Sequence, residues 1–233
     1  MEEVEYSGRD NLEVMRTAVN YNKFLLDLVF TSARKGESIV DFGAGSGTFS
    51  LPMAVAGYDV TCIETDPTLS RELARQGMTV LPGLDQVEDE SIDYIYSLNV
   101  LEHIEADSDI VALWCKKLRP GGKLMVYVPA FQILFSSMDH KVGHIRRYSR
   151  GELCRKLSNG GFEISEARYA DSLGFFAALL YRLIDKGNGS IDSKKLRAFD
   201  RWIFPLSLIL DSISHRLLGK NVYALAIKPI KSS

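Results

Sequence analysis

The chain has 233 residues, of which 46% are hydrophobic and 25% are charged, and its formal net charge is −2 at pH 7. These values suit one globular domain with an elaboration, and they exclude a disordered or fibrous chain. The near-neutral charge gives no sign of a nucleic-acid surface, and no apolar run reaches the ~20 residues of a membrane span. Three scattered cysteines without CxxC spacing and an acidic, polar N-terminus predict a cytoplasmic protein with reduced thiols.

The first predicted element is a helix over residues 11–33, because apolar side chains recur there at helical spacing. Strands and helices then alternate, which predicts right-handed crossovers and a mostly parallel sheet. The predicted strands are 38–42, 59–64, 78–81, 92–97, 122–128, 162–169 and 221–228, and the predicted helices are 48–56, 67–76, 106–118 and 150–159.

A glycine-rich turn follows the first predicted strand. Gly43, Ala44, Gly45 and Gly47 come directly before a helix predicted from Thr48. Glycine permits a sharp turn, a positive φ and the close approach of a ligand to the backbone. The start of the helix adds unpaired N–H groups and a partial positive charge. This turn therefore predicts a site for the polar or anionic part of a nucleotide-like ligand.

The spacing of the glycines and two acidic residues indicate which ligand this is. A dinucleotide fingerprint would place its third glycine five residues after the first, where this chain has Thr48. Asp41, at the end of the first strand, suits a cationic ammonium better than a pyrophosphate. Glu64, at the tip of the second strand, can accept hydrogen bonds from both ribose hydroxyls. A ligand with an amino-acid end, a ribose and no phosphate fits, namely S-adenosylmethionine.

Four segments of the chain resemble the class I S-adenosylmethionine-dependent methyltransferases. They are VDFGAGSG at 40–47, IETD at 63–66, SIDYIYSLNVLEHI at 91–104 and LRPGGKLMVYVP at 118–129. Each is weak alone, but the four in this order and spacing are specific. The resemblance covers residues 39–162. It implies an α/β, Rossmann-like fold with a mostly parallel seven-stranded sheet, helices on both faces and S-adenosyl-L-methionine as cofactor.

The resemblance also implies roles for single residues around the cofactor. Asp41 orients the glycine-rich loop or the ammonium, and Glu64 binds the ribose. Thr65 lies beside the adenine, and Asp85, after the third strand, meets the adenine amino group. Asn99, just past the fourth strand, meets the methionine moiety.

The segment from Asn99 to His103 is similar to a segment of ubiquinone-pathway O-methyltransferases, in which acidic residues and a histidine can hold a divalent metal. Glu102 and His103 match that pattern, whereas Asn99 replaces an acidic residue. We therefore expect no metal here. The simpler interpretation is that Glu102 caps a helix and that His103 packs near the cofactor.

Residues 139–148 follow the fifth predicted strand, at the edge where open parallel sheets bind ligands. The stretch GHIRRY at 143–148 resembles a segment of methyltransferases that act on sugars and other small hydroxylated molecules. His140 or His144 can take a proton from the acceptor, because histidine titrates near neutral pH. Arg146 or its neighbour can clamp a phosphate or carboxylate, and Tyr148 completes the candidate catalytic set. The alternative is a structural loop whose arginines pair with nearby carboxylates.

Residues 172–220 depart from the bare methyltransferase core, in which a short hairpin joins the last two strands. They contain two apolar blocks, 173–181 and 202–210, and the second belongs to a helical stripe from Phe199 to Leu217. This insertion can pack on the sheet as a cap, or it can line a pocket for a bulky apolar substrate. It can also rest on a membrane surface or a partner subunit, since interfacial helices carry Trp, Phe and Leu opposite charges.

The sequence thus predicts one class I methyltransferase domain over residues 1–233, with residues 172–220 as a helical insertion between the last two strands. We expect an S-adenosylmethionine-dependent enzyme that methylates a small-molecule or lipid-linked acceptor, with oxygen as the acceptor atom. Its expected location is the cytoplasm or the inner face of a membrane, without a nucleic-acid partner. Two alternatives are a nucleotide-dependent oxidoreductase, against which Thr48 argues, and a non-catalytic cofactor-binding module at a membrane or protein partner.

Overall fold

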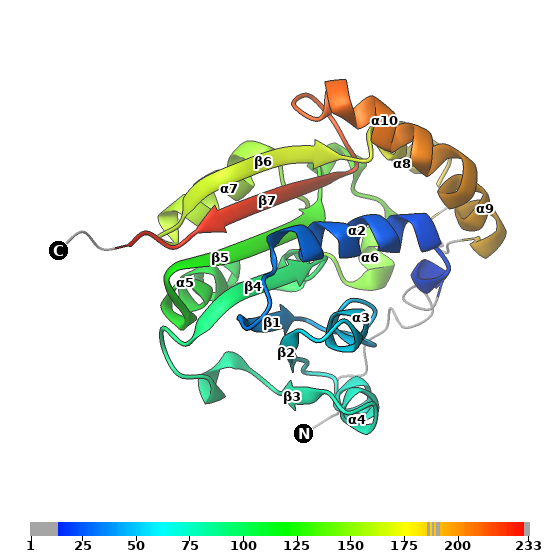
Figure 1. The fold of residues 1–233 in the computed structure, drawn as a ribbon. Helices are drawn as coiled ribbons and strands as arrows, with labels where there is room; N and C mark the ends of the chain where they lie inside the picture. Colours follow the sequence, from blue (N-terminus) through cyan, green and yellow to red (C-terminus); the bar gives the residue numbers. More distant parts are fainter. Residues whose placement is uncertain (1–13, 186, 188, 190–191, 231–233) are drawn as a thin grey trace.

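The computed structural model describes residues 14–185, 187, 189 and 192–230, and these contain a seven-stranded sheet (Figure 1). The strand order is β3-β2-β1-β4-β5-β7-β6, and β7 runs antiparallel to both of its neighbours. The predicted α/β fold with a mostly parallel seven-stranded sheet is confirmed. The strands are β1 (Ser38–Phe42), β2 (Asp59–Ile63), β3 (Thr79–Leu81), β4 (Ile92–Leu98), β5 (Leu118–Pro129), β6 (Glu163–Ala170) and β7 (Asn221–Ile227).

Helices cover both faces of the sheet. α5 (Asp107–Lys117) and α7 (Arg150–Asn159) pack on one face, where Trp114 and Leu153 are fully buried. The opposite face is covered by α2 (Val19–Ser32), α3 (Ser50–Val55) and α4 (Pro67–Arg75).

Each face of the sheet has its own hydrophobic core, and alternate residues of one strand contribute to the two cores. In β4 the side chains of Tyr94 and Tyr96 join the core under α2, whereas that of Ile95 joins the core under α5. In β5, Met125 and Val126 divide between the two cores in the same way. Successive side chains of a strand point to opposite faces, so a sheet buried on both sides needs apolar residues at nearly every position.

The carboxyl ends of β1 to β6 all lie at one edge of the sheet, because these strands run in the same direction. Three non-glycine residues with positive φ lie within two residues of strand ends at this edge: Asn99 (55°) after β4, Phe131 (58°) after β5 and Asp171 (61°) after β6. Such conformations cost free energy and gather at functional sites. The backbone therefore marks this edge as a site.

The insertion between β6 and β7 is helical, as the sequence predicts. It contains α8 (Ser172–Ile184), α9 (Ser193–Ala198), the π-helical turn η4 (Phe199–Ile203) and α10 (Phe204–Ser214). Figure 1 shows α8 and α10 side by side beyond the end of the sheet. Pro205 in the first turn of α10 has no N–H to donate, which accounts for the wide turn that precedes it.

The insertion is tied to the first helix through Asp200. Its carboxylate accepts hydrogen bonds from the N–H groups of Asn20 (3.0 Å) and Tyr21 (2.8 Å) at the start of α2. Ala18 at the N-cap position has no side chain that could do this. A residue from the far end of the chain thus caps α2.

Three predicted boundaries differ from the structure. The helix predicted over 11–33 is interrupted at Thr17 and Ala18, and its residues 11–13 lie outside the described part. The helix predicted from Thr48 begins at Ser50, and β5 begins at Leu118 rather than at residue 122. A short helix, α6 (Ser137–Val142), lies in the segment after β5, where none was predicted. Among the described residues, no helix has the length and apolar character of a membrane span.

Candidate functional site

The glycine-rich loop joins β1 to α3, and its glycines serve two purposes. Gly43, Gly45 and Gly47 all have positive φ, at 83°, 56° and 81°. A Cβ atom at Gly43 would lie 2.4 Å from Val100 Cγ2, and one at Gly47 would lie 2.7 Å from Leu73 Cδ2. A Cβ atom at Gly45 would meet nothing within 4 Å. Packing therefore requires the outer two glycines, whereas the middle one leaves the backbone open to a ligand.

Glu64 fixes this loop from the end of β2. Its Oε2 accepts a hydrogen bond from the Gly45 N–H at 2.7 Å, and its Oε1 accepts one from the Asp66 N–H at 2.8 Å. Burial raises the pKa of Glu64, although these backbone donors oppose the shift. Thr65, between the two, is exposed, and Asp66 caps α4 through the N–H groups of its first turn. Glu64 thus lies beside the open face of Gly45, where the predicted ribose contact requires it.

Asp41 lies in β1 with 2% of its surface exposed. Burial raises the pKa of Asp41 to about 7, the Glu64 charge adds to the shift, and the nearby hydroxyls of Tyr96 and Ser50 oppose it. Within the described residues, its Oδ2 atom accepts no hydrogen bond. A buried carboxylate oxygen without a donor suits a cationic group such as an ammonium. The open face of Gly45 and the carboxylates of Asp41 and Glu64 therefore fit S-adenosylmethionine.

Asn99 and Asp85 occupy the same edge. The Asn99 N–H donates to the Tyr127 carbonyl at 2.7 Å, which holds Asn99 in its left-handed conformation, and the Asn99 side chain interacts with Tyr21 of α2. Asp85 is exposed in the 3-10 turn η1 (Leu84–Gln86), after β3. Both positions agree with the expected cofactor contacts, which remain predictions.

The segment after β5 is organised around Asp139 of α6. The Asp139 carboxylate lies 2.7 Å from His144 Nδ1 and accepts hydrogen bonds from Arg147 Nε at 2.8 Å and Nη2 at 3.0 Å. Burial raises the pKa of Asp139, but the bonds to His144 and Arg147 outweigh it and hold that pKa at about 2. Asp139 is therefore ionised and fixes the His144 ring.

Arg146 and Tyr148, which the sequence suggests for the acceptor site, both have partners inside the protein. The Arg146 Nη1 atom and the Tyr148 hydroxyl both donate to Asp107 Oδ2 at 2.8 Å, and Lys156 Nζ donates to Asp107 Oδ1 at 2.7 Å. Tyr148 is also buried, and its hydroxyl lies 3.1 Å from the Leu101 carbonyl. These two side chains anchor the start of α5. These contacts favour the alternative of a structural loop for Arg146 and Tyr148.

His140 is exposed on α6 and contacts the Phe135 ring, with the ring centroids 4.9 Å apart. It lines a shallow groove between α6 and α8, whose other walls include Lys141, Arg182 and Asp185. This groove is a different environment from that of His144. The structure therefore separates the two histidines that the sequence offers as alternative bases.

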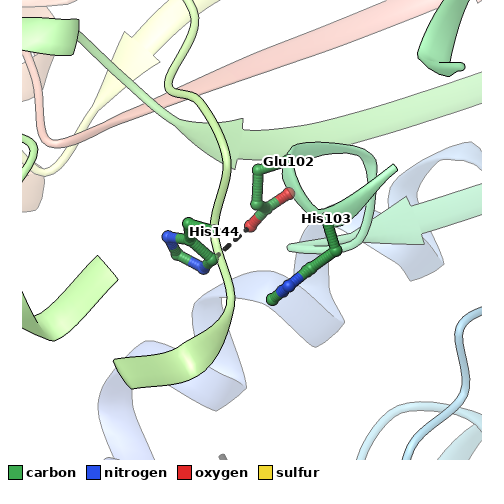
Figure 2. Close-up of side chains that lie close together, drawn as sticks. All are labelled: Glu102, His103 and His144. Carbon is green, nitrogen blue, oxygen red and sulfur yellow. Dashed lines mark ion pairs between the residues drawn. The ribbon is translucent and has the colours of Figure 1, made fainter. Parts of the chain in front are cut away.

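His144 instead meets Glu102 and His103, which belong to the turn η2 (Leu101–His103) after β4 (Figure 2). One ligand atom from each of the three side chains lies within 4.8 Å of the others, and His144 Nε2 is 3.6 Å from Glu102 Oε1. The Ile145 N–H donates to the Glu102 carbonyl at 3.0 Å, which holds the two segments together. We name these three residues the Glu-His-His cluster.

Burial dominates the electrostatics of the Glu-His-His cluster. It raises the pKa of Glu102 to about 8, although the Arg147 charge opposes the shift. Burial also lowers the pKa of His103 to about 4, and the neighbouring His144 adds to this effect. A neutral imidazole can accept a proton or bind a metal ion. The sequence interpretation missed the link between Glu102 and His144, because 41 residues separate them, and only the adjacency of β4 and β5 brings them together.

Residues 15–167 match the family model described as "Methyltransferase domain". A curated relative, the "Uncharacterized 37.1 kDa protein in transposon TN4556" of Streptomyces fradiae, is 30% identical over 184 residues, which are 73% of this chain and 52% of that protein. The ubiquinone biosynthesis O-methyltransferase of Xanthomonas oryzae is 31% identical over 112 residues, which are 42% of this chain and 47% of that enzyme. The chain thus spans about half the length of these curated relatives.

A solved structure of a methyltransferase from Thermotoga maritima, described as S-adenosylmethionine-dependent, has the same fold. Its TM-score is 0.64 at 15% sequence identity, and the match covers 94% of this chain and 95% of that one. The family model covers well over half of the chain and includes β1 to β5 and the glycine-rich loop. The prediction of a methyltransferase domain is therefore confirmed at the level of the family. The chain belongs to the methyltransferase-domain family.

Proposed function

We propose that this protein transfers the methyl group of S-adenosylmethionine to an oxygen atom of a small apolar or lipid-linked acceptor. The observation that carries the proposal is the open face of Gly45 between two buried acids, Asp41 and Glu64. The matched region of the ubiquinone biosynthesis O-methyltransferase supports oxygen as the acceptor atom. The GHIRRY segment supports a small hydroxylated acceptor.

The bound cofactor supplies a methyl group that is already activated by its positive sulfur, so the protein has to align the acceptor and remove a proton. Alignment of two reactants contributes roughly 7–11 kcal/mol, and a general base adds a factor of about 10²–10⁴. We propose that the Glu-His-His cluster removes the proton of the acceptor hydroxyl. The cluster lies at the same edge of the sheet as Gly45. Asp139 holds the His144 ring so that its Nε2 atom faces Glu102.

The insertion supports an apolar acceptor that is held at a membrane. Large apolar side chains are exposed along α8 at Phe176, Leu180, Leu183 and Ile184, and along η4, α10 and the residues after them at Trp202, Leu206, Ile209, Ile213 and Leu217. Their spacing of three and four residues places each set on one side of its helix.

The exposed charges of the same insertion are mainly basic. They are Arg182, Lys194, Lys195, Arg197, Arg201 and Arg216, and Asp192 is the exposed acid among the described residues of 172–220. The whole chain is slightly acidic, so this excess is local. Apolar stripes with flanking cations are typical of helices that lie on anionic lipid. We therefore propose an anionic membrane surface as the partner of the insertion.

The methyl-transfer experiment uses S-adenosylmethionine with a labelled methyl group and two cell fractions, a total lipid extract and an aqueous extract. We expect the label in a lipid-soluble product. A reagent that reacts only with amines should leave this product unchanged. Glu64→Ala should yield much less labelled product at the same cofactor concentration, because it should bind the cofactor more weakly. Label only in water-soluble products would contradict an apolar acceptor, and a labelled amine would contradict oxygen as the acceptor atom.

A second experiment measures co-flotation with vesicles of phosphatidylglycerol or of phosphatidylcholine. We expect the protein to float with the anionic vesicles and to release at high salt, because the basic side chains are exposed. Trp202→Gln combined with Ile209→Gln should abolish flotation, whereas Val55→Gln, at a residue that is 90% exposed on α3, should not. A dimer in solution that the same double variant dissociates would identify a second copy of the chain as the partner and overturn the membrane proposal.

A further inference from the structure

Lys220 directly precedes β7 and lies at the carboxyl edge of the sheet. Its N–H donates to the Asp171 carbonyl at 2.9 Å, and its carbonyl accepts a hydrogen bond from the Ala130 N–H at 2.8 Å. These bonds fix its main chain between the segments that follow β5 and β6. We propose that the Lys220 ammonium binds an anionic group of the methyl acceptor. This inference rests on the proposed function, and it adds one chemical feature to the acceptor.

The first argument is that the Lys220 ammonium has no direct partner. Within the part of the chain that the structure describes, it forms no hydrogen bond and no ion pair. The centroid of the Tyr21 ring is 6.0 Å from its Nζ atom, at the outer limit of a cation–π contact. Burial lowers the pKa of Lys220, although the Asp171 charge opposes the shift. Removal of a cation from water is costly unless an anion pairs with it, so a ligand anion would stabilise this group.

The two acids that border Lys220 are engaged elsewhere. Asp171 Oδ1 accepts hydrogen bonds from the Gly174 N–H and the Ser207 hydroxyl, both at 2.9 Å, and Asp171 is the N-cap of α8. The carboxylate of Asp200 caps α2 in a similar way. The positive ends of α8 and α2 therefore compensate these two charges. The described residues provide no such compensation for Lys220.

The second argument is the position of Lys220 between the two parts of the candidate site. Tyr21, whose ring faces the ammonium, also interacts with Asn99, the expected contact of the methionine moiety. The charges of Arg147 and Asp139, beside the Glu-His-His cluster, act on Lys220 as well. The ammonium is thus within electrostatic reach of the cofactor edge and of the proposed base. A ligand that offers its hydroxyl to the Glu-His-His cluster can place a second group at Lys220.

The third argument is a small hollow beside Lys220, with a volume of about 20 Å³. Its apolar walls include Tyr21 of α2, Phe199 of η4 and Phe204 of α10. Such a volume holds one group of the size of a water molecule or a carboxylate oxygen. Ligand sites commonly combine apolar walls with a few polar groups that fix the orientation. The hollow lies between α2 and the insertion, so it suits an acceptor that approaches from the proposed membrane surface.

These observations define the acceptor as an amphiphile with a hydroxyl and a separate anionic group. The Glu-His-His cluster is proposed to take the proton of the hydroxyl, whereas a carboxylate or a phosphate at Lys220 needs no proton transfer. A lysine ammonium is a compact charge that binds either of these groups. An uncharged molecule of the same shape should therefore bind more weakly.

The test is isothermal titration calorimetry of the full chain saturated with S-adenosylhomocysteine. The probes are benzoate and phenyl phosphate, each with one aromatic ring and one anionic group, and benzyl alcohol as the uncharged counterpart. We expect at least one of the two anions to bind about tenfold more tightly than benzyl alcohol, because a hydrogen bond to a charged group is strong. The anion with the higher affinity identifies the preferred group as a carboxylate or a phosphate.

Three variants make the assignment specific. Lys220→Met keeps a linear side chain and removes the charge, so it should weaken the binding of the preferred anion about tenfold or more. Its affinities for benzyl alcohol and S-adenosylhomocysteine should not change. Lys220→Arg keeps the charge and should retain the anion. Lys23→Met, at an exposed lysine of α2, should behave like the original protein, and melting temperatures would show that all three variants are folded.

Three results would overturn the inference. The first is an equal anion affinity of Lys220→Met and the original protein, and the second is an original protein that binds neither anion better than benzyl alcohol. The third is a labelled methyl product without an anionic group, which would leave methyl transfer standing. Conversely, a protein that loses the anion in Lys220→Met but methylates no acceptor would refute the proposed function and retain the anion site.

Discussion

The carboxylate of Glu64 accepts a hydrogen bond from the main-chain N–H of Gly45 at 2.7 Å, so the tip of β2 supports the loop that leaves β1. The same carboxylate is the expected partner of the ribose hydroxyls. A bound ribose would thus contact an acid whose position is already fixed by the loop. Such preorganisation reduces the ordering cost of binding.

Replacement of Glu64 by Ala should weaken the binding of S-adenosylhomocysteine by about 10–100-fold, because hydrogen bonds to a charged group contribute about 1.5–3 kcal/mol. Isothermal titration calorimetry would measure the dissociation constant. Glu72→Ala removes an exposed acid from α4 and is the matched control. Equal affinities of Glu64→Ala and the original protein would refute the ribose contact.

Replacement of Gly45 by Ala should weaken cofactor binding through the added Cβ, and its positive φ should also lower the unfolding free energy by about 1 kcal/mol. Gly36 is a suitable control, since it has a φ of 81° and equally open surroundings. Gly36→Ala should lower the melting temperature similarly and leave the affinity intact. If both variants bind the cofactor equally well, the open face of Gly45 is not where it lies.

The affinity for the cofactor should depend on pH through Asp41, whose pKa of about 7 places its titration near neutrality. A cationic ammonium binds the ionised form better, so affinity should fall about tenfold or more between pH 7.5 and 5.5. Asp41→Asn should bind more weakly at pH 7.5, and its affinity should change much less over this range. Calorimetry in buffers of different ionisation enthalpy would detect the released proton, and its absence would contradict this role of Asp41.

The same group should affect the stability of the cofactor-free protein in the opposite direction. The raised pKa means that the folded state holds this proton more tightly than the unfolded state does. The contribution of Asp41 to stability is therefore present below about pH 4 and is lost as the pH rises to about 7, by at most ~1.4 kcal/mol per pH unit. Denaturant titrations of the original protein and Asp41→Asn would isolate this contribution, and parallel pH profiles would contradict it.

The structural role assigned to Tyr148 is also testable. Tyr148→Phe deletes the hydrogen bond to Asp107 and should lower the unfolding free energy by about 1–3 kcal/mol. Turnover should be retained below the melting temperature, because this hydroxyl is occupied inside the protein. A stable variant with a large loss of kcat would restore Tyr148 to the catalytic set.

The cap that the insertion provides to α2 can be tested at Asp200. Asp200→Ala leaves the N–H groups of Asn20 and Tyr21 without their acceptor and should cost about 1–2 kcal/mol. Asp192→Ala removes a local cap of α9 and is the control for the loss of an acid from the insertion. We expect only Asp200→Ala to increase hydrogen exchange at the start of α2.

Much of the fold could be predicted from local sequence. The strands are short apolar runs bounded by turns, and β1 and β4 match their predicted ranges closely because both faces of the sheet are buried. The helix predicted over 11–33 was too long, because its apolar period continues through Thr17 and Ala18, where the chain turns to meet Asp200. The spacing of apolar residues carries no information about a cap that comes from the other end of the chain.

The candidate site also contains some residues that local sequence can identify and others that only the fold brings together. Gly45 and Glu64 are recognisable because their roles follow from the turn and from the strand tip beside it. The pairing of Glu102 with His144, and that of Tyr148 with Asp107, depends on which segments meet in space. A cluster of polar residues in sequence, such as GHIRRY, cannot by itself show which side chains are occupied by internal partners.

The cap that Asp200 provides to α2 has a thermodynamic consequence. The Tyr21 N–H donates to this carboxylate, and the Tyr21 side chain interacts with Asn99 after β4, so one short chain of contacts connects the outer helices to the carboxyl edge of the sheet. A displacement of η4 would remove the acceptor of the Asn20 and Tyr21 N–H groups. If attachment of the outer helices to a surface changes the affinity for a ligand at that edge, reciprocity requires the ligand to change the affinity for the surface by the same factor.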